Sequence, residues 1–127
     1  MLIANGNASD YLEFTMIKMI IKMNDDRLRQ QNEYTPDKVY STLDRIFEQK
    51  GMERIETNKG VEYRGHDKPT DFGHFGQIMI GLKKQSWFMD NASTWLFCNN
   101  DDVDDPSDFS EEDLLAHYKR KFALNGR

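Results

Sequence analysis

The chain is poor in cysteine, with a single one, Cys98, among its 127 residues. One cysteine excludes an internal disulfide, and no Cys/His spacing indicates a zinc site. The thiol stands between Phe97 and Asn99. We expect a small buried hydrophobic side chain there, because a reactive thiol needs an activating group beside it. This cysteine usage is typical of a reducing compartment.

Long uninterrupted hydrophobic runs are also missing. Asp10, Glu13, Lys18 and Lys22 divide the most apolar stretch, which excludes a membrane-spanning helix of about 20 residues. No basic segment precedes an apolar run near the N-terminus, so no secretory leader is expected and a cytoplasmic location is predicted. Mean hydropathy is low at -0.80, but 12% of the residues are aromatic, which favours a folded chain over a disordered one. The length predicts a single domain over 1–127.

The first half of the chain predicts two helices and a hairpin. Asp10 and Glu13 are spaced like a capping box, which predicts a first helix that runs to Met23. Its apolar stripe is broad enough to need cover on two sides, so a homodimer is compatible with it. A strand over 17–23 is the less favoured alternative, because Lys18 and Lys22 are spaced four apart. The polar stretch 25–33 indicates a short helical turn or a loop.

The second predicted helix covers 36–50. Thr35 is a suitable N-cap, Pro36 suits the first helical position, and Gly51 follows as a stop. The buried face is expected to consist of Val39, Leu43, Ile46 and Phe47. From residue 52 the apolar period changes to two, so 52–57 and 61–64 predict a hairpin around a glycine-containing turn.

The second half predicts a loop over 65–76, three further strands (77–82, 86–89 and 95–98), a loop, and a final helix. Ser110 is expected to cap that helix, with Glu111, Glu112 and Asp113 in its first turn. The order lacks alternating strands and helices. The sequence therefore predicts an α+β fold: two N-terminal helices, an antiparallel sheet of four to five strands, and a C-terminal helix packed on one face.

Two histidines are the candidates for chemistry. His66 and His74 share a glycine-rich stretch with Asp67 and Asp71, and histidine with carboxylate can bind a metal or transfer a proton. No metalloprotease or nucleophile motif accompanies them, so a role in ordering the loop is favoured over an active site. We predict that the protein is not an enzyme and needs no cofactor.

The most unusual segment is 101–113, the acidic segment. It holds eight acids and no base: Asp101, Asp102, Asp104, Asp105, Asp108, Glu111, Glu112 and Asp113. The whole chain has a net charge of -5, yet without these eight it has 14 acids and 17 bases. A helix N-terminus accounts for the last three acids, whereas the four aspartates of 101–105 repel one another unless a cation meets them.

Calcium is one cation to test against this segment. Asn100, Asp102, Asp104 and Glu111 fall at positions one, three, five and twelve of an EF-hand loop. Asp105, however, stands where that loop requires glycine, so no metal site is predicted. A basic protein partner is favoured, and the predicted partner-binding residues are Asp101, Asp102, Asp104, Asp105, Asp108, Glu111 and Glu112.

A DNA-binding role is the alternative. The capped helix 36–50 followed by the hairpin 52–64 resembles the recognition helix and wing of winged-helix transcription regulators. The resemblance implies that Lys38, Ser41, Thr42 and Arg45 meet DNA, with Arg54 and Lys59 on the wing. Asp37, Asp44 and Glu48 lie among these positions, and the net negative charge disfavours nucleic acid as a partner.

The stretch 95–118, with an aromatic strand, the aspartate run and a final helix, resembles small acidic bacterial toxin-immunity proteins, including those of contact-dependent growth inhibition systems. The resemblance implies a cytoplasmic protein that binds and neutralises one cognate toxin, often a cationic nuclease. The acids of 101–112 would then imitate phosphate charge towards the toxin's lysines and arginines. This is the function that the sequence favours.

Overall fold

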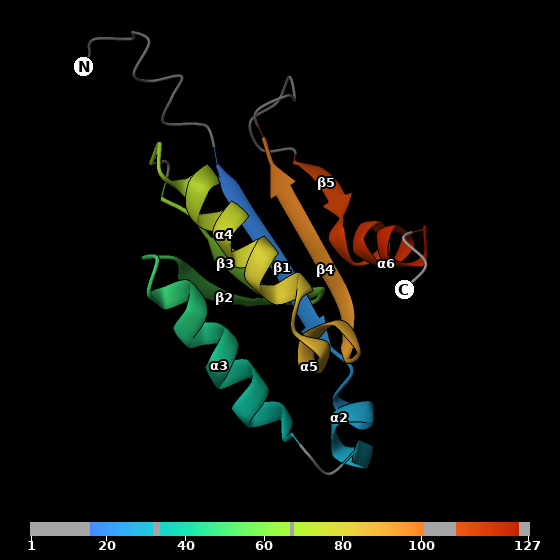
Figure 1. Cartoon of the computed structure of the whole chain (residues 1–127). Coiled ribbons are helices and arrows are strands. Elements are labelled where there is room, and N and C mark those ends of the chain that lie inside the picture. Colours follow the sequence, from blue (N-terminus) through green and yellow to red (C-terminus); the bar gives the residue numbers. More distant parts are fainter. Residues whose placement is uncertain (1–15, 32–33, 67, 101–108, 125–127) are drawn as a thin grey trace, which may run out of the picture.

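The computed structural model describes residues 16–31, 34–66, 68–100 and 109–124 (Figure 1). The elements follow the order β1 (Ile17–Met23), α2 (Asp25–Gln31), α3 (Pro36–Glu48), β2 (Glu53–Thr57), β3 (Gly60–Arg64), α4 (Asp71–Lys83), α5 (Ser86–Met89), β4 (Ala92–Asn99), β5 (Ser110–Asp113) and α6 (Leu114–Leu124). In these ranges no helix is both long and apolar enough to cross a membrane.

The five strands form one sheet in the order β2-β3-β1-β4-β5, and every neighbouring pair is antiparallel. Strands β1 and β2 are therefore parallel to each other with β3 between them, and α3 lies in their connection. Strands β3 and β4 are likewise parallel to each other, with β1 between them and α4 in their connection. This β-α-β-β-α-β path is the split βαβ, or ferredoxin-like, arrangement, to which β5 and α6 are added. The predicted α+β class is confirmed, and a fold of this kind does not by itself indicate a function.

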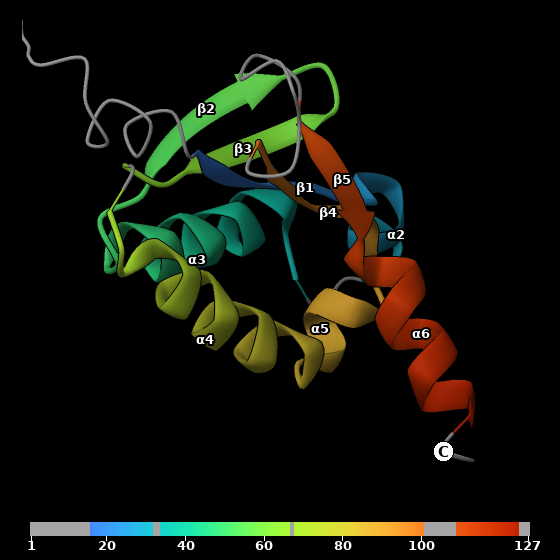
Figure 2. The ribbon, with the colours of Figure 1, turned by 90° about the horizontal axis from the view of Figure 1, so that it is seen from above.

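Helices α3, α4 and α5 lie on one face of the sheet (Figures 1 and 2). The core fills the space between the layers. The ring of Phe47 on α3 stacks on Tyr63 of β3 at 3.9 Å between centroids, and Phe88 of α5 meets Trp95 of β4 edge-on. Trp95 is fully buried and also contacts Tyr118 of α6. These aromatic contacts fix where α3 and α6 sit against the sheet.

The predicted helix from Asp10 to Met23 is wrong over the residues that the structure describes, because 17–23 is the central strand β1. It pairs with β3 on one side and β4 on the other. Its burial does not alternate cleanly, since Ile17, Met19, Ile20, Ile21 and Met23 are all buried. A strand buried on both faces reads as a continuous apolar run, and such a run is difficult to distinguish from a helix.

The predicted strands 77–82 and 86–89 are wrong as well. Residues 77–82 lie in α4, which begins at Asp71 within the predicted loop, and 86–89 form the short helix α5. The predicted helix start is wrong by three residues, because Ser110 was expected to cap a helix whose first turn begins at Glu111. Residues 110–113 pair with β4 as the outer strand β5, and α6 begins at Leu114, where the Asp113 carboxylate accepts a hydrogen bond from the Ala116 N–H at 3.0 Å.

Other predictions are confirmed. Residues 25–31 form the short helix α2, and the hairpin and the strand 95–98 correspond to β2–β3 and β4. The helix predicted over 36–50 is α3, capped by Thr35, whose hydroxyl accepts a hydrogen bond from the Lys38 N–H. Its buried face holds Val39, Leu43 and Phe47.

The sheet curls so that its two outer parts approach each other. Lys59, in the turn between β2 and β3, forms an ion pair of 2.9 Å with Glu111 of β5. Three strand spacings of about 4.8 Å separate β3 from β5, which is farther than these two side chains can span across a flat sheet. Figure 2 shows the β2–β3 turn next to β5. The face opposite the helices, called the concave face below, is therefore partly enclosed.

The enclosure explains the burial on the concave face. Glu62 is only 3% exposed, and its carboxylate pairs with Lys18 of β1 at 3.3 Å and with Arg64. The Lys18 ammonium also lies 4.0 Å from the centroid of the Phe109 ring. Cys98 is fully buried on this face. A charged cluster thus occupies the side of the sheet that no described helix covers.

Candidate functional site

A polar cavity of about 540 Å³ lies where β1 ends, beside the N-terminal half of α3 and the β2–β3 hairpin. It is called the acidic cleft here. It is lined by Lys22, Asp25, Asp37, Tyr40, Ser41, Asp44, Arg54, Glu56, Thr57, Asn58, Gly60 and Val61. Four carboxylates face two cations in this set, so its formal charge is negative.

A hydrogen-bonded network forms one wall of the cleft. The Tyr63 hydroxyl donates to Asp44 Oδ1 at 2.6 Å, and Arg54 Nε donates to the same oxygen at 2.9 Å. Arg54 also pairs with Glu56 at 3.4 Å. Burial and the bond to Asp44 raise the pKa of Tyr63 well above its ordinary value, so the phenol stays protonated. Arg54 is thus held by two carboxylates of its own chain.

Another part of the wall is lined by two further acids, Asp25 and Asp37. In the described ranges neither Asp25 nor Asp37 forms an ion pair, although both line the cleft. Asp25 Oδ1 is buried and has no hydrogen-bond partner within the described structure. Tyr40, between them, is half-buried and accepts a hydrogen bond from the Met23 N–H at 2.9 Å. Its pKa is raised by burial, which keeps it neutral. This wall can therefore receive a positively charged group.

Of the predicted partner-binding residues, Asp101, Asp102, Asp104, Asp105 and Asp108 lie outside the residues that the structure describes. Glu111 and Glu112 are exposed on β5. Glu111 is partly neutralised by the ion pair with Lys59, which raises the pKa of that lysine, mainly through their hydrogen bond.

A second cavity, of about 690 Å³, connects this region to the acidic cleft. Glu111 and Asp113 line it together with Lys59 and Lys119, and Lys22 and Asn58 line both cavities. The end of the acidic segment and the acidic cleft therefore lie next to each other.

Sequence reasoning missed the cleft because its four acids come from three separate elements, α2, α3 and β2. Asp25 lies in a stretch that was interpreted only as a polar turn or loop, and Asp37 and Asp44 were noted only as acids on the helix 36–50. No spacing in the sequence brings these residues together with Glu56. Only the return of the hairpin past α3 does so.

The two candidate histidines, His66 and His74, lie outside the two cavities described above. His66 is exposed. The loop is ordered by Asp71, which is 4% exposed and whose Oδ2 accepts hydrogen bonds from the N–H groups of His66 and Lys68. His74 Nδ1 is buried without a hydrogen-bond partner in the described structure. Within the ranges that the structure covers, no group of three or more His, Cys, Asp and Glu side chains could hold a metal.

Cys98 is a fully buried thiol. Burial, followed by the negative charge of Glu111, raises its pKa to about 11. A thiol with this pKa carries almost no thiolate at neutral pH, and thiolate is the reactive form. The expectation of a small buried hydrophobic side chain is therefore confirmed.

Some of the residues that the DNA-binding alternative requires are engaged in contacts within the protein, and others are exposed. Arg54 is held by Asp44 and Glu56, and the hairpin continues through β3 into the sheet beside β1. The Thr42 hydroxyl donates to the carbonyl of Lys38 within α3. Lys38, Ser41 and Arg45 are wholly or largely exposed.

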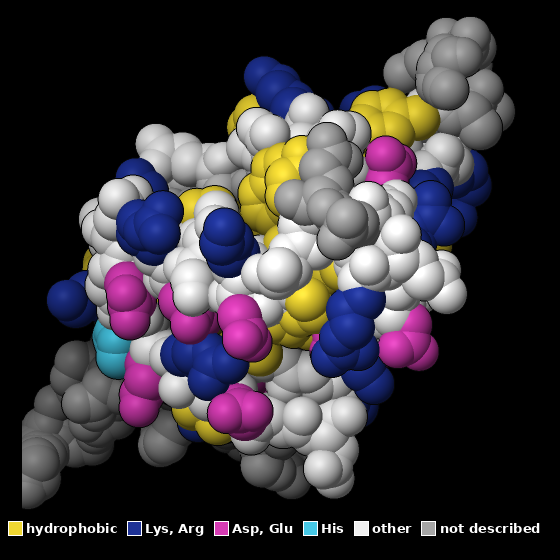
Figure 3. Space-filling model, turned by 90° about the horizontal axis from the view of Figure 1, so that it is seen from below, with side chains coloured by type: hydrophobic (Ala, Val, Ile, Leu, Met, Phe, Trp, Pro, Cys, Tyr) yellow, Lys and Arg dark blue, Asp and Glu magenta, His cyan; other side chains and the backbone are white. Residues whose placement is uncertain are grey.

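On the surface seen in Figure 3, several acidic side chains gather on one side around a basic one, and basic and hydrophobic side chains are spread over the rest. Comparison of the chain with protein-family models, with curated proteins and with solved structures finds no match.

Proposed function

We propose that the protein is an inhibitor of the immunity type, which binds a basic toxin through the acidic cleft and the acidic segment next to it. The observation that carries the proposal is the pair of carboxylates in the cleft, Asp25 and Asp37, without an ion pair in the described part of the chain. The cations that line the cavity are Lys22 and Arg54. Arg54 already pairs with Asp44 and Glu56, so it does not neutralise Asp25 or Asp37.

The shape of the cleft supports recognition of a side chain rather than of a flat surface. A cavity of about 540 Å³ has room for a lysine or arginine side chain from a partner. A guanidinium group has five N–H donors in a planar fork, which suits two nearby carboxylates. Asp25 has no ion pair in the described structure, so a cation in the cleft would supply a charge that this carboxylate lacks.

The acidic segment extends the receiving surface. Its last residues lie on β5, in the cavity that adjoins the cleft. Concentrated negative charge increases the rate of association with a cationic protein and depends strongly on salt. A nuclease toxin has lysine and arginine side chains placed to bind the phosphates of its substrate. A surface of carboxylates can bind the same side chains and so block the substrate. The sequence resemblance to immunity proteins supports the same function.

The test is a complex with the toxin domain encoded by the neighbouring gene. The protein and that domain, carrying an inactivating substitution, are mixed and their affinity is measured by calorimetry at two salt concentrations. The double variant Asp25→Asn, Asp37→Asn is expected to weaken binding by about tenfold, because two interfacial charge pairs are lost. It should also reduce the dependence on salt.

The matched control is Asp26→Asn, Asp90→Asn, which removes two exposed acids that do not line the cleft. It should leave the affinity within about twofold. A second variant converts Asp101, Asp102, Asp104 and Asp105 to Asn and tests the acidic segment separately. Unchanged affinity in both acid-to-amide variants would remove the acidic surface from the interface. The absence of any complex would remove the immunity function itself.

A further inference from the structure

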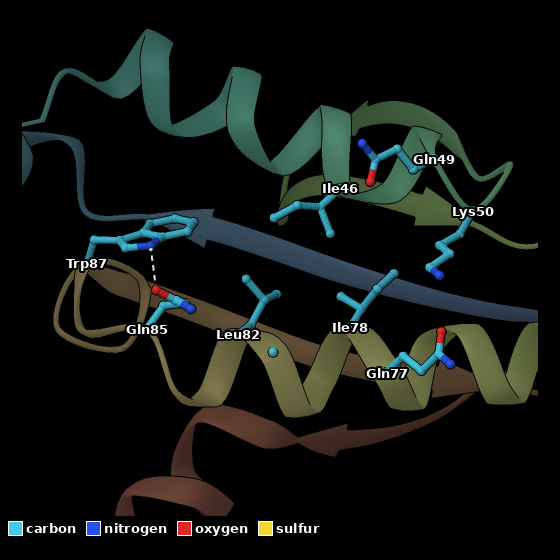
Figure 4. Close-up of a pocket in the computed structure, with 9 residues that line it drawn as sticks. Ile46, Gln49, Lys50, Gln77, Ile78, Leu82, Gln85 and Trp87 are labelled. Carbon is cyan, nitrogen blue, oxygen red and sulfur yellow. Dashed lines mark hydrogen bonds between the residues drawn. The ribbon is translucent and has the colours of Figure 1, made fainter.

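An apolar groove of about 440 Å³ lies between α3 and α4 (Figure 4). It is separate from the acidic cleft and shares none of its lining residues. The middle of the groove is aliphatic: Ile46 of α3 faces Ile78 and Leu82 of α4. The volume is within the range of about 300–1,000 Å³ that is usual for small-molecule sites. The groove is therefore large enough for a ligand of modest size.

Gly81 of α4 is one of the residues that line the groove. A Cβ atom built on it would meet no heavy atom within 4 Å, and the same is true of Gly73 and Gly76 in this helix. Gly81 differs from those two glycines because it lines the groove. The space beside it is therefore open, and a bulky side chain at this position has room to occupy part of the groove.

The two ends of the groove differ in polarity. Figure 4 shows Lys50, in the turn after α3, and Gln77 of α4 pointing toward each other at one end, with Gln49 beside them. At the other end lies Trp87, whose indole N–H donates to Gln85 Oε1 at 3.2 Å. Lys50 is the single charged side chain among the nine residues that line the groove, and within the described ranges it forms no ion pair.

We propose that this groove binds a small amphipathic carboxylate, with the anionic head against Lys50 and the apolar tail directed toward Trp87. One lysine and two side-chain amides balance a single negative charge and can donate to both carboxylate oxygens. A phosphate carries a charge of about -1.5 to -2 and is usually met by arginine or a helix N-terminus. The aliphatic middle of the groove suits an unbranched hydrocarbon tail.

The experiment uses decanoate as the probe and the full chain as the receptor, with binding measured by calorimetry below the concentration at which the probe forms micelles. Two molecules with the same tail serve as head-group controls, decanol and decyltrimethylammonium. Saturable one-to-one binding of decanoate is expected. Decanol should bind more weakly, and the cation more weakly still. Trp87 fluorescence should change on binding, whereas the change should disappear in Trp87→Phe, in which the buried Trp95 remains.

Two matched variants on α4 separate binding from folding. Gly81→Phe fills the groove and should weaken decanoate binding by about tenfold or more, because the ring occupies the space of the tail. Gly73→Phe is the control, because a Cβ at Gly73 also meets no heavy atom within 4 Å and Gly73 does not line the groove. It should leave binding unchanged. Lys50→Gln should weaken decanoate binding by about threefold and leave decanol binding unchanged, as expected for an exposed ion pair.

Several results would overturn the proposal. Equal binding of decanoate by Gly81→Phe would place the ligand elsewhere, and equal binding of the cationic probe would remove Lys50 as the head-group contact. Binding to anionic phospholipid vesicles without binding of monomeric decanoate would assign the surface to a membrane. A dimer that dissociates in Gly81→Phe, measured by sedimentation, would assign it to a second copy of the chain.

Discussion

Replacement of Glu62 by glutamine tests whether the charged cluster of the concave face is desolvated. The carboxylate is 3% exposed and lies 3.3 Å from the Lys18 ammonium. At an effective dielectric constant of about 20, two unit charges at this distance attract each other by roughly 5 kcal/mol. Part of this gain is offset by desolvation, and removing one partner of a buried pair typically costs about 3–5 kcal/mol.

The expected loss is somewhat smaller here. The side chains of Lys18 and Arg64 are 15% and 42% exposed, so water can partly solvate the cations that remain. We expect Glu62→Gln to lower the free energy of unfolding by about 2–3 kcal/mol. The double variant Lys18→Met, Glu62→Leu should recover part of this loss, because an apolar pair of similar volume replaces the buried charge pair. Arg64 loses its partner in this variant, but its side chain is 42% exposed and water can solvate it.

The assay is urea unfolding followed by the fluorescence of the buried Trp95. The matched control is Glu56→Gln in the same sheet. Glu56 also pairs with an arginine, at 3.4 Å, but its side chain is 79% exposed. That change should cost less than about 0.5 kcal/mol. Equal effects of Glu62→Gln and Glu56→Gln would show that burial does not strengthen the pair, and the reasoning about the concave face would be wrong.

Three further predictions follow from described contacts. Cys98, with a pKa of about 11 against an ordinary 9.0, should react with a thiol reagent at pH 8 only after unfolding. Its contribution to the free energy of unfolding should be constant below pH 9 and should fall between pH 9 and 11, because in that range the unfolded thiol ionises and the folded one does not. Gly60→Ala should destabilise the protein by more than about 1 kcal/mol in urea unfolding, because Gly60 has a φ of 141° and a Cβ there would lie 2.5 Å from the Ile21 carbonyl oxygen. Gly81→Ala should instead stabilise the protein by about 0.5–1 kcal/mol, because a Cβ at that helical position meets no heavy atom within 4 Å. Asp71→Ala should cost about 2–3 kcal/mol by calorimetric unfolding, because two backbone N–H groups lose their acceptor, and Asp71→Asn, which keeps an oxygen there, should cost less.

The parts of the fold that could be predicted are those with local signals. Helix α3 has a cap at Thr35, a proline at its first position and one apolar face. The hairpin has a glycine at its turn, Gly60, whose positive φ few other residues adopt. In these segments the sequence itself marks where the element begins, where it ends and which residues face the core. The tertiary contacts therefore agree with the local preference.

Strand β1 shows why the rest could not be predicted. Lys18 and Lys22 are four apart, which places them on one face of a helix, but any even spacing also places them on one face of a strand. Both faces of β1 are buried, so the two-residue period that identifies a strand is hidden. In α4 the opposite happened. Its glycines disfavour a helix and the run 78–80 favours a strand by propensity. The burial of Phe75, Ile78 and Leu82 against the sheet decides for a helix.

The candidate sites differ in the same way. The acidic segment is visible in the sequence because its residues are contiguous. The acidic cleft and the groove each depend on side chains from two or more elements, such as Asp37 with Glu56, or Lys50 with Gln77. Spacing along the chain carries no information about such pairs, since the connections between the elements determine the distance.

The two outermost strands of the sheet have a further consequence. Strand β2 reads Glu-Arg-Ile-Glu-Thr and β5 reads Ser-Glu-Glu-Asp, so nearly every position carries a charge or a hydroxyl group. A strand offered by another molecule would have to desolvate these charges in order to use the free backbone hydrogen bonds. The sheet is therefore protected against growth by strand addition, which lowers the tendency to form fibrillar aggregates and leaves recognition to cavities lined by side chains.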